Sequence, residues 1–385
     1  MSARKIAAWH AAGLIDVDTR DAILAYEAAH ARPLALWAVF GIGALAIGLG
    51  IVSVIAANWE DIPGQLRLGV HLALIAGALA ALFLREKPMA EASPWAVEAL
   101  VFVTAALGLT FFGHLGQVYQ TSSPLWKPLA AWLALFAPLL LLNGRSWPVA
   151  AAFMGGAVWC VWDYAGMITG YNAAPPGLPL VLWMAFVTAL PVLAAPLAAG
   201  MRARSRRADF WRRLEQLALA YAVGGASFAC ALASAGAYGE NVADDHLAAM
   251  ALRGGMALLA ALGVVLLRRG MSGRMSGAII AAAGVTGALA VFADDAVVPA
   301  ALLFMALWII IAAAALAAHW RGVFQLAVAV IAGRLIVLSF ELAGDLLTSG
   351  FGLILSGAMI LGVAWAAVRV SRTFAPPADD AEDAA

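Results

Sequence analysis

Long apolar runs separated by short polar breaks dominate this chain. The first run, LALWAVFGIGALAIGLGIVSVIAA at residues 34–57, contains no charged residue. A helix of about 17–25 apolar residues is long enough to cross the hydrocarbon core of a bilayer. This criterion predicts twelve spans, at residues 34–57, 65–84, 95–113, 125–142, 147–169, 178–199, 216–237, 247–267, 276–293, 298–317, 322–341 and 350–368. The predicted fold is therefore all-α, a polytopic transmembrane bundle of about 12 helices.

Composition supports a membrane protein. Of the 385 residues, 64% are hydrophobic and 12% are charged. Cys160 and Cys230 each lie alone inside an apolar run, so we interpret both as small buried hydrophobic residues and not as metal ligands. The sequence predicts no metal site and no cofactor.

The basic residues are sorted along the chain. All but four of the 23 Lys and Arg residues fall on alternate polar breaks. The opposite breaks carry acidic residues instead, at positions 60, 61, 240, 244, 245, 294 and 295. Because Lys and Arg concentrate in cytoplasmic loops, we expect both termini and the basic breaks to be cytoplasmic.

This pattern predicts five segments. Residues 1–33 form a short cytoplasmic helical hairpin, with a break at Gly13 and a second helix capped by Asp18. Residues 34–199 hold six spans, 200–215 a basic cytoplasmic loop, 216–368 six further spans, and 369–385 a disordered acidic tail. The basic loop is expected to attract anionic lipid headgroups.

Motifs of several common functions do not occur. The chain contains neither GxxxxGK[ST] nor HExxH nor GxSxG, and it has no basic, aromatic-interleaved surface for nucleic acid. Two sets of six spans around a basic loop suggest a major facilitator layout. However, residues 84–94 read LREKPMAEASP, without the Gly-, Asp- and Arg-rich turn typical of that superfamily.

Three stretches carry a family resemblance. They are WHAAGLID near the start, IAANWEDIPGQLRLG after the glycine-rich first span, and LTFFGHLGQVYQTSSPLWKPLAAWLALFAPLLLL further on. Together they resemble the bacterial predicted membrane protein family catalogued as domain of unknown function twenty-one fifty-seven, over about residues 1–145. A looser likeness continues at residues 331–365. The resemblance implies a multi-pass protein of a bacterial cytoplasmic (inner) membrane and assigns no activity.

Four basic residues are not assigned to the cytoplasmic breaks: Arg67, Lys127, Arg253 and Arg334. An ionisable group at the bilayer centre costs about 2.5–3.5 kcal/mol on insertion scales, so it faces protein or water and has a partner. With a rise of about 1.5 Å per residue, several polar residues fall in one layer of the outer third of the bundle. We therefore predict a polar cavity formed by Arg334, Glu341, Asp345, Asp163, His71, Arg67, Arg253, His114, Gln117 and Tyr119.

Arg334 has two interpretations. It is seven residues from Glu341 and eleven from Asp345, which places all three on one helix face. Arg334 is either neutralised by Asp163 or Glu341 and holds helices together, or it faces a ligand. His71 and His114 similarly either bind loop carbonyls or line the cavity.

The sequence ANWEDIPG at residues 57–64 predicts a turn at the outer surface. Trp59 is interpreted as an interfacial anchor, and Glu60 and Asp61 as solvated carboxylates. Together with Asn58 they form a candidate outer-loop motif.

Three functions remain open. A transporter would bind a small anionic solute at Arg334, or exchange protons at Asp163 and Glu341. A membrane enzyme acting on a lipid-linked substrate would use Glu60, Asp61, His71 or His114 as acid and base. A non-catalytic scaffold or sensor would act through the hairpin at residues 1–33. No partner other than the lipid bilayer is predicted.

Overall fold

The computed structural model describes residues 6, 9–29, 62–92, 94–170, 177–238, 244–342 and 350–374. All regular secondary structure in these ranges is helical, which confirms the all-α fold. The chain divides into two compact units, Met1–Arg67 and Leu68–Ala385, which are described separately. The predicted span at residues 34–57, the motif Asn58–Asp61, and Asp345 lie outside the described residues.

The described part of the first unit has a helical turn that ends before Gly13, followed by a second helix. Gly13 has φ +70°, a conformation that glycine adopts without steric cost, and the Leu14 N–H donates to the Trp9 carbonyl at 3.0 Å. Glycine thus ends the first helical turn, as the sequence predicted. The second helix, α2, spans Val17–Ala29.

The cap of α2 is Asp16 and not the predicted Asp18. Asp16 Oδ1 accepts a hydrogen bond from the Thr19 N–H at 2.8 Å. Hydrogen bonds from the Thr19 side chain and then from its N–H lower the pKa of Asp16. Asp18 instead lies in the first turn of α2. Both aspartates precede the apolar residues of this helix, so spacing alone favoured the wrong one.

The helices that follow match the apolar runs. Each predicted span from residue 65 onward overlaps a helix in the described ranges. In chain order the elements are α4 (Gly64–Ala92), α5 (Pro94–Tyr119), α6 (Trp126–Asn143), α7 (Trp147–Gly170), α8 (Leu178–Ala189), η1 (Leu190–Leu193), α9 (Ala194–Arg202), α10 (Ala208–Ser234), α11 (Asp244–Leu267), α12 (Met271–Leu289), η2 (Ala290–Ala293), α13 (Val297–Ala317), α14 (Arg321–Leu342) and α15 (Gly350–Phe374).

Nine helical stretches among the described residues are long and apolar enough to cross a membrane. One of them, Leu178–Arg202, joins α8, η1 and α9, and its 3-10 turn coincides with Pro191, which has no N–H to donate. Helices α7 and α15 coincide with two further predicted spans but are not among the nine. The chain is thus a multi-pass membrane protein.

Two predicted boundaries were wrong. The linker between α9 and α10 contains only residues 203–207, because α10 begins at Ala208 inside the predicted loop 200–215. Phe210, Leu214 and Ala218 of α10 are four residues apart and fully buried, so a buried helix face begins among the charged residues. Helix α15 continues to Phe374, so residues 369–374 are helical and not part of a disordered tail.

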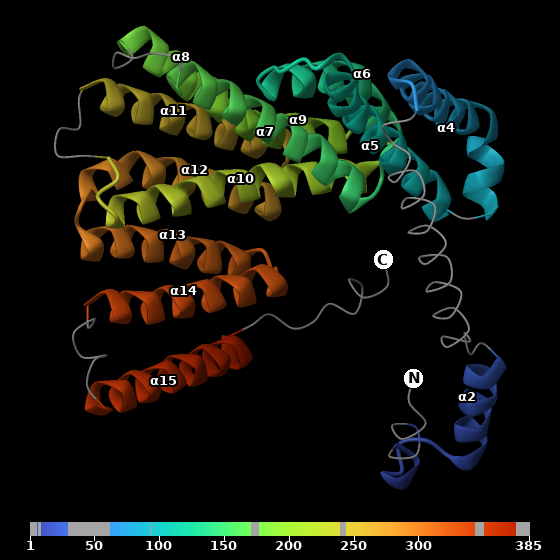
Figure 1. Ribbon diagram of the computed structural model, residues 1–385. Helices are drawn as coiled ribbons and strands as arrows, with labels where there is room; N and C mark the ends of the chain where they lie inside the picture. The colour runs from blue at the N-terminus through green and yellow to red at the C-terminus, as the bar shows by residue number, and fades with distance from the viewer. Residues whose placement is uncertain are drawn as a thin grey trace. The chain divides into compact units, whose positions relative to one another are not determined.

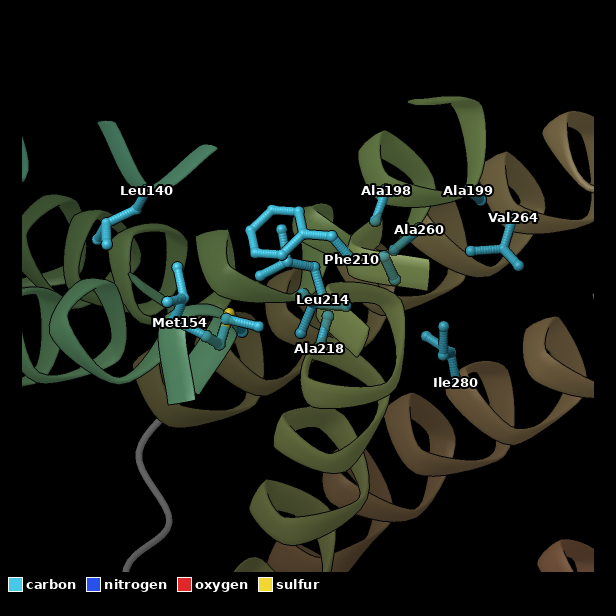
Figure 2. Packing of buried hydrophobic residues seen from close by; sticks show 14 of the residues in the cluster. Leu140, Met154, Ala198, Ala199, Phe210, Leu214, Ala218, Ala260, Val264 and Ile280 are labelled. Carbon is cyan, nitrogen blue, oxygen red and sulfur yellow. The ribbon is translucent and has the colours of Figure 1, made fainter. Parts of the chain in front are cut away.

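Consecutive helices in the second unit lie side by side. Figure 1 shows α12, α13, α14 and α15 stacked in chain order. The main apolar core lies around the first half of α10 (Figure 2). There Phe210, Leu214 and Ala218 lie among side chains of α6, α7, α9, α11 and α12, namely Leu140, Met154, Ala198, Ala260, Val264 and Ile280.

Helices α11 and α12 approach closely through small residues. A Cβ added at Gly284 would lie 2.6 Å from the Cβ of Ala257 and 3.2 Å from the Gly254 carbonyl oxygen. Only a residue without a side chain fits this crossing. The contact fixes the segment of α11 that carries Arg253.

At one end of the second unit, hydrogen bonds tie the arginine-containing linkers between helices to the neighbouring helices. Arg207 donates from Nη1 to the Gly144 carbonyl at 2.8 Å and from Nη2 to the Leu141 carbonyl at 2.6 Å, so it satisfies the C-terminus of α6. Glu98 Oε2 accepts from the N–H groups of Arg145 and Ser146 at 3.0 and 2.8 Å, just before α7.

At the same end, Glu215 of α10 forms ion pairs with two arginines. Its Oε1 lies 2.6 Å from Arg268 Nη1, and its Oε2 lies 3.5 Å from Arg202 Nη1. Glu215 is buried, so the two arginines supply the charge that it requires. The basic pattern of the sequence predicted only the orientation of these arginines, and the pairing with Glu98 and Glu215 was not predicted.

Candidate functional site

The four basic residues that were not assigned to cytoplasmic breaks lie in different environments. They are Arg67, Lys127, Arg253 and Arg334. Lys127 is exposed, with Nζ 5.8 Å from the centroid of the Trp126 ring. Arg67 lies in the first turn of α4, and its backbone N–H donates to the Pro63 carbonyl at 3.1 Å. Arg253 and Arg334 lie within α11 and α14. Both Arg253 and Arg334 donate side-chain hydrogen bonds to other helices.

Arg334 is neutralised by its own helix. Its Nη1 donates to both carboxylate oxygens of Glu341, at 3.0 and 2.9 Å, and its Nη2 donates to Ser234 Oγ of α10 at 3.1 Å. The seven-residue spacing predicted this shared face. Arg334 therefore joins α14 to α10, and its charge is already balanced.

Asp163, the other partner proposed for Arg334, has a different role. Its Oδ2 accepts a hydrogen bond from the Trp126 N–H at 2.7 Å, at the first residue of α6. A carboxylate here satisfies one unpaired N–H and opposes the positive end of the helix dipole. Asp163 thus joins α7 to α6.

His71 and His114 form a hydrogen-bonded pair between α4 and α5. Their Nδ1 atoms are 3.2 Å apart, and His71 Nε2 lies 3.0 Å from the Leu107 carbonyl oxygen. A carbonyl only accepts, so His71 Nε2 carries a hydrogen. When both rings are neutral, His114 Nδ1–H therefore donates to His71 Nδ1. Gln117 and Tyr119 are exposed at the end of α5.

The predicted cavity is thus not one site. The described members form separate sets of contacts: Arg334 with Glu341 and Ser234, Asp163 with Trp126, His71 with His114 and Leu107, and Arg253 with Thr188. Similar depth along different helices did not bring them together.

Arg253 lines a pocket of about 300 Å³ enclosed by α7, α8, η1, α10, α11 and α12. Its walls are largely small or apolar residues, including Gly225, Ala257 and Gly284. The polar groups around it belong to Trp162, Thr188, Tyr221, Tyr238 and Arg253. Asp, Glu, His and Lys are absent from the described lining.

Hydrogen bonds fix the polar wall. Trp162 Nε1 donates to the Tyr221 hydroxyl oxygen at 2.9 Å, and the Tyr221 hydroxyl donates to the Thr188 carbonyl. The Tyr238 hydroxyl donates to the Ala229 carbonyl at 3.2 Å. These bonds hold two phenol groups and one indole group in defined positions around the pocket.

Arg253 differs from Arg334 in its charge balance. Its Nη2 donates to Thr188 Oγ1 at 3.1 Å, but no carboxylate among the described residues forms an ion pair with it. Its Nε is buried and makes no hydrogen bond within the same ranges. A cation in a membrane-spanning helix thus faces an apolar pocket whose described lining holds no opposite charge.

Sequence reasoning included Arg253 but missed its neighbours. Thr188, Tyr221 and Tyr238 come from α8, from α10 and from the turn after α10, so chain spacing does not relate them to α11. A polar residue inside an apolar run was the only signal available. The described residues contain no group of three His, Cys, Asp or Glu side chains that could hold a metal ion.

Comparison with known families gives one match. Residues 7–149 match the family described as predicted membrane protein (DUF2157). This range agrees with the resemblance expected for residues 1–145. It does not include any lining residue of the Arg253 pocket, which spans positions 162–288. No curated protein and no solved structure matches the chain.

Proposed function

We propose that this protein is a multi-pass transporter of the bacterial inner membrane that binds a small organic anion at Arg253. The observation that carries the proposal is the Arg253 guanidinium at the wall of the pocket, which forms an ion pair with no carboxylate among the described residues. A bound anion would supply the missing negative charge. Arg334, the cation that the sequence favoured for this role, is already paired with Glu341.

The chemistry of the pocket favours a carboxylate with a short apolar part. A guanidinium has five N–H donors in a planar fork that suits a carboxylate. The bond to Thr188 uses one of them. The remaining lining is mostly apolar, and about 300 Å³ lies at the small end of ligand pockets.

Transport suits this site better than catalysis. General acid–base chemistry needs a titratable group near the reacting atoms. Apart from Arg253, the described lining provides only the phenols of Tyr221 and Tyr238, and both donate their hydrogens to backbone carbonyls. His71 and His114 bind each other elsewhere in the unit. We further propose that the arginine-rich end of the bundle is cytoplasmic.

Uptake into proteoliposomes tests this proposal. The purified full chain would be reconstituted and supplied with labelled acetate, butyrate or octanoate. We expect uptake of at least one of these anions, lost in Arg253→Gln and partly kept in Arg253→Lys. Lys127→Gln removes an exposed charge outside the pocket and serves as the matched control. Absence of uptake, or uptake unchanged in Arg253→Gln, would contradict the proposal.

A further inference from the structure

A second pocket lies at the arginine-rich end, apart from the Arg253 pocket. Its volume is about 370 Å³, and its described lining consists of Arg145, Arg206, Arg207, Asp209, Phe210 and Arg213. Four guanidinium groups and one carboxylate leave a net charge of 4 − 1 = +3. The pocket is therefore strongly positive.

Two linkers and the start of α10 build this pocket. Arg207 is held against the C-terminus of α6 by its bonds to Gly144 and Leu141, and its guanidinium lies 5.6 Å from the Phe210 ring centroid. Phe210 is itself fully buried in the core (Figure 2). Arg207 is thus fixed in position before any ligand binds.

Arg213 is fixed from the other side. Its Nη1 donates to the Arg145 carbonyl, and its guanidinium lies 5.8 Å from the Trp147 ring centroid. The Nε of Arg213 is buried and makes no hydrogen bond within the described ranges. Arg213 therefore retains a donor that the protein does not use.

The described residues balance the charge of this pocket only in part: Glu98, the carboxylate that accepts from the Arg145 N–H, acts on Arg207 from outside the lining. Asp209 pairs with Arg212, which is not a lining residue, at 3.4 Å. No described carboxylate forms an ion pair with Arg145, Arg206, Arg207 or Arg213. Burial, and after it the charge of Arg145, lowers the pKa of Arg207, and the charge of Glu98 offsets this only in part. An anion in the pocket would relieve this repulsion.

We propose that the pocket formed by Arg145, Arg206, Arg207 and Arg213 binds a phosphate group. Guanidinium forks match phosphate oxygens in bidentate geometry, and a charge of +3 suits a group that carries one or two negative charges. The group belongs either to an anionic phospholipid headgroup or to a soluble phosphate. Trp147, half exposed beside the pocket, is a typical interfacial residue and favours headgroup depth.

Direct binding distinguishes the two sources. The full chain in detergent would be titrated with phosphatidic acid in mixed micelles, with phosphatidylcholine as the zwitterionic control, and with inorganic phosphate. Saturable binding of phosphatidic acid that inorganic phosphate does not displace would identify a lipid headgroup. Binding of inorganic phosphate with displacement of the lipid would identify a soluble phosphate. Either result supports the phosphate site.

Matched variants decide whether the pocket itself binds. Arg145 and Arg206 are exposed, and their side chains make no described hydrogen bond, so Arg145→Gln with Arg206→Gln should fold. We expect this double variant to weaken binding about tenfold or more. Arg204→Gln removes one charge from the same linker outside the pocket and should change binding less than about twofold.

Two results would overturn this proposal. One is equal weakening by Arg204→Gln and by the double variant, which would indicate attraction to surface charge alone. The other is the absence of binding by the unmodified chain. Arg253→Gln should leave phosphate binding unchanged, so the phosphate site and the transport proposal fail independently.

Discussion

Arg253 donates a hydrogen bond from Nη2 to the hydroxyl oxygen of Thr188, 3.1 Å away on another helix. The same hydroxyl donates to the Met184 carbonyl at 2.8 Å, so its hydrogen is directed along α8 and its oxygen is free to accept. One threonine thus holds the guanidinium at the wall of the pocket. The pair connects α8 to α11 and sets the position of the proposed anion site.

Thr188→Val should loosen this arrangement. Valine has nearly the same shape but cannot accept a hydrogen bond, and a bond to a charged group contributes about 1.5–3 kcal/mol. We expect a lower thermal unfolding temperature and weaker anion uptake, whereas Thr188→Ser should retain both. Equal stability of Thr188→Val and the unmodified chain would show that the hydroxyl does not hold Arg253.

The pair of Arg334 and Glu341 should behave as a structural ion pair. Glu341→Gln leaves a cation that is mostly buried without its counter-charge, at a cost of about 1.5–3 kcal/mol because Glu341 is partly solvated. Adding Arg334→Gln should restore much of the loss, measured as thermal unfolding in detergent. Asp163→Asn in place of the second change should not restore it, since Asp163 binds the start of α6.

Gly284→Ala should weaken the crossing of α11 and α12. The new Cβ would lie 2.6 Å from the Ala257 Cβ, and overpacking of this kind costs about 1–3 kcal/mol. Gly255→Ala is the control, because nothing lies within 4 Å of its added Cβ. We expect the unfolding temperature to fall only for Gly284→Ala. An equal fall for both changes would show that the close contact at Gly284 is not the cause.

Thiol labelling in intact cells tests the proposed orientation. Ser122 is exposed in the linker before α6, and Ala203 is exposed in the linker before α10. The proposed topology places these two linkers on opposite sides of the membrane. With Cys160 and Cys230 changed to Ala, an impermeant reagent should label Ser122→Cys and not Ala203→Cys. Labelling only of Ala203→Cys would reverse the proposed orientation.

The sequence predicted the helices well because burial in lipid requires long apolar runs. The sequence-based prediction was wrong at the start of α10. There Arg212 and Arg213 made the segment look like a polar loop, although the buried face of the helix already begins at Phe210. Periodicity found Arg334 and Glu341 because both lie on one helix. The neighbours of Arg253 could not be found in this way. Thr188 is 65 residues away in sequence, and its contact with Arg253 depends on how α8 packs against α11.

Depth estimates along separate helices had the same weakness. They placed Asp163, His71 and Arg253 in one layer but gave no rotation for any helix. Glu98 and Glu215 were not predicted, because each lies near the end of an apolar run, where the sequence alone gives no sign of burial. In the structure both are buried and bind the arginine-containing linkers directly.

The central claim is that Arg253 makes its pocket selective for anions, and the reactivity of a cysteine in the pocket tests it most directly. Gly225 lines the pocket and has open space at its Cβ, so Gly225→Cys should fit without strain. Gly224→Cys, also in open space but not a lining residue, is the control. Cys160 and Cys230 would again be changed to Ala.

The measurement is the ratio of reaction rates with an anionic and a cationic thiosulfonate of similar size. Because the guanidinium attracts anions, we predict that Arg253→Gln lowers the anionic-to-cationic ratio at Gly225→Cys about tenfold. The ratio at Gly224→Cys should stay nearly constant. An unchanged ratio at Gly225→Cys, or a cysteine there that neither reagent reaches, would contradict the account.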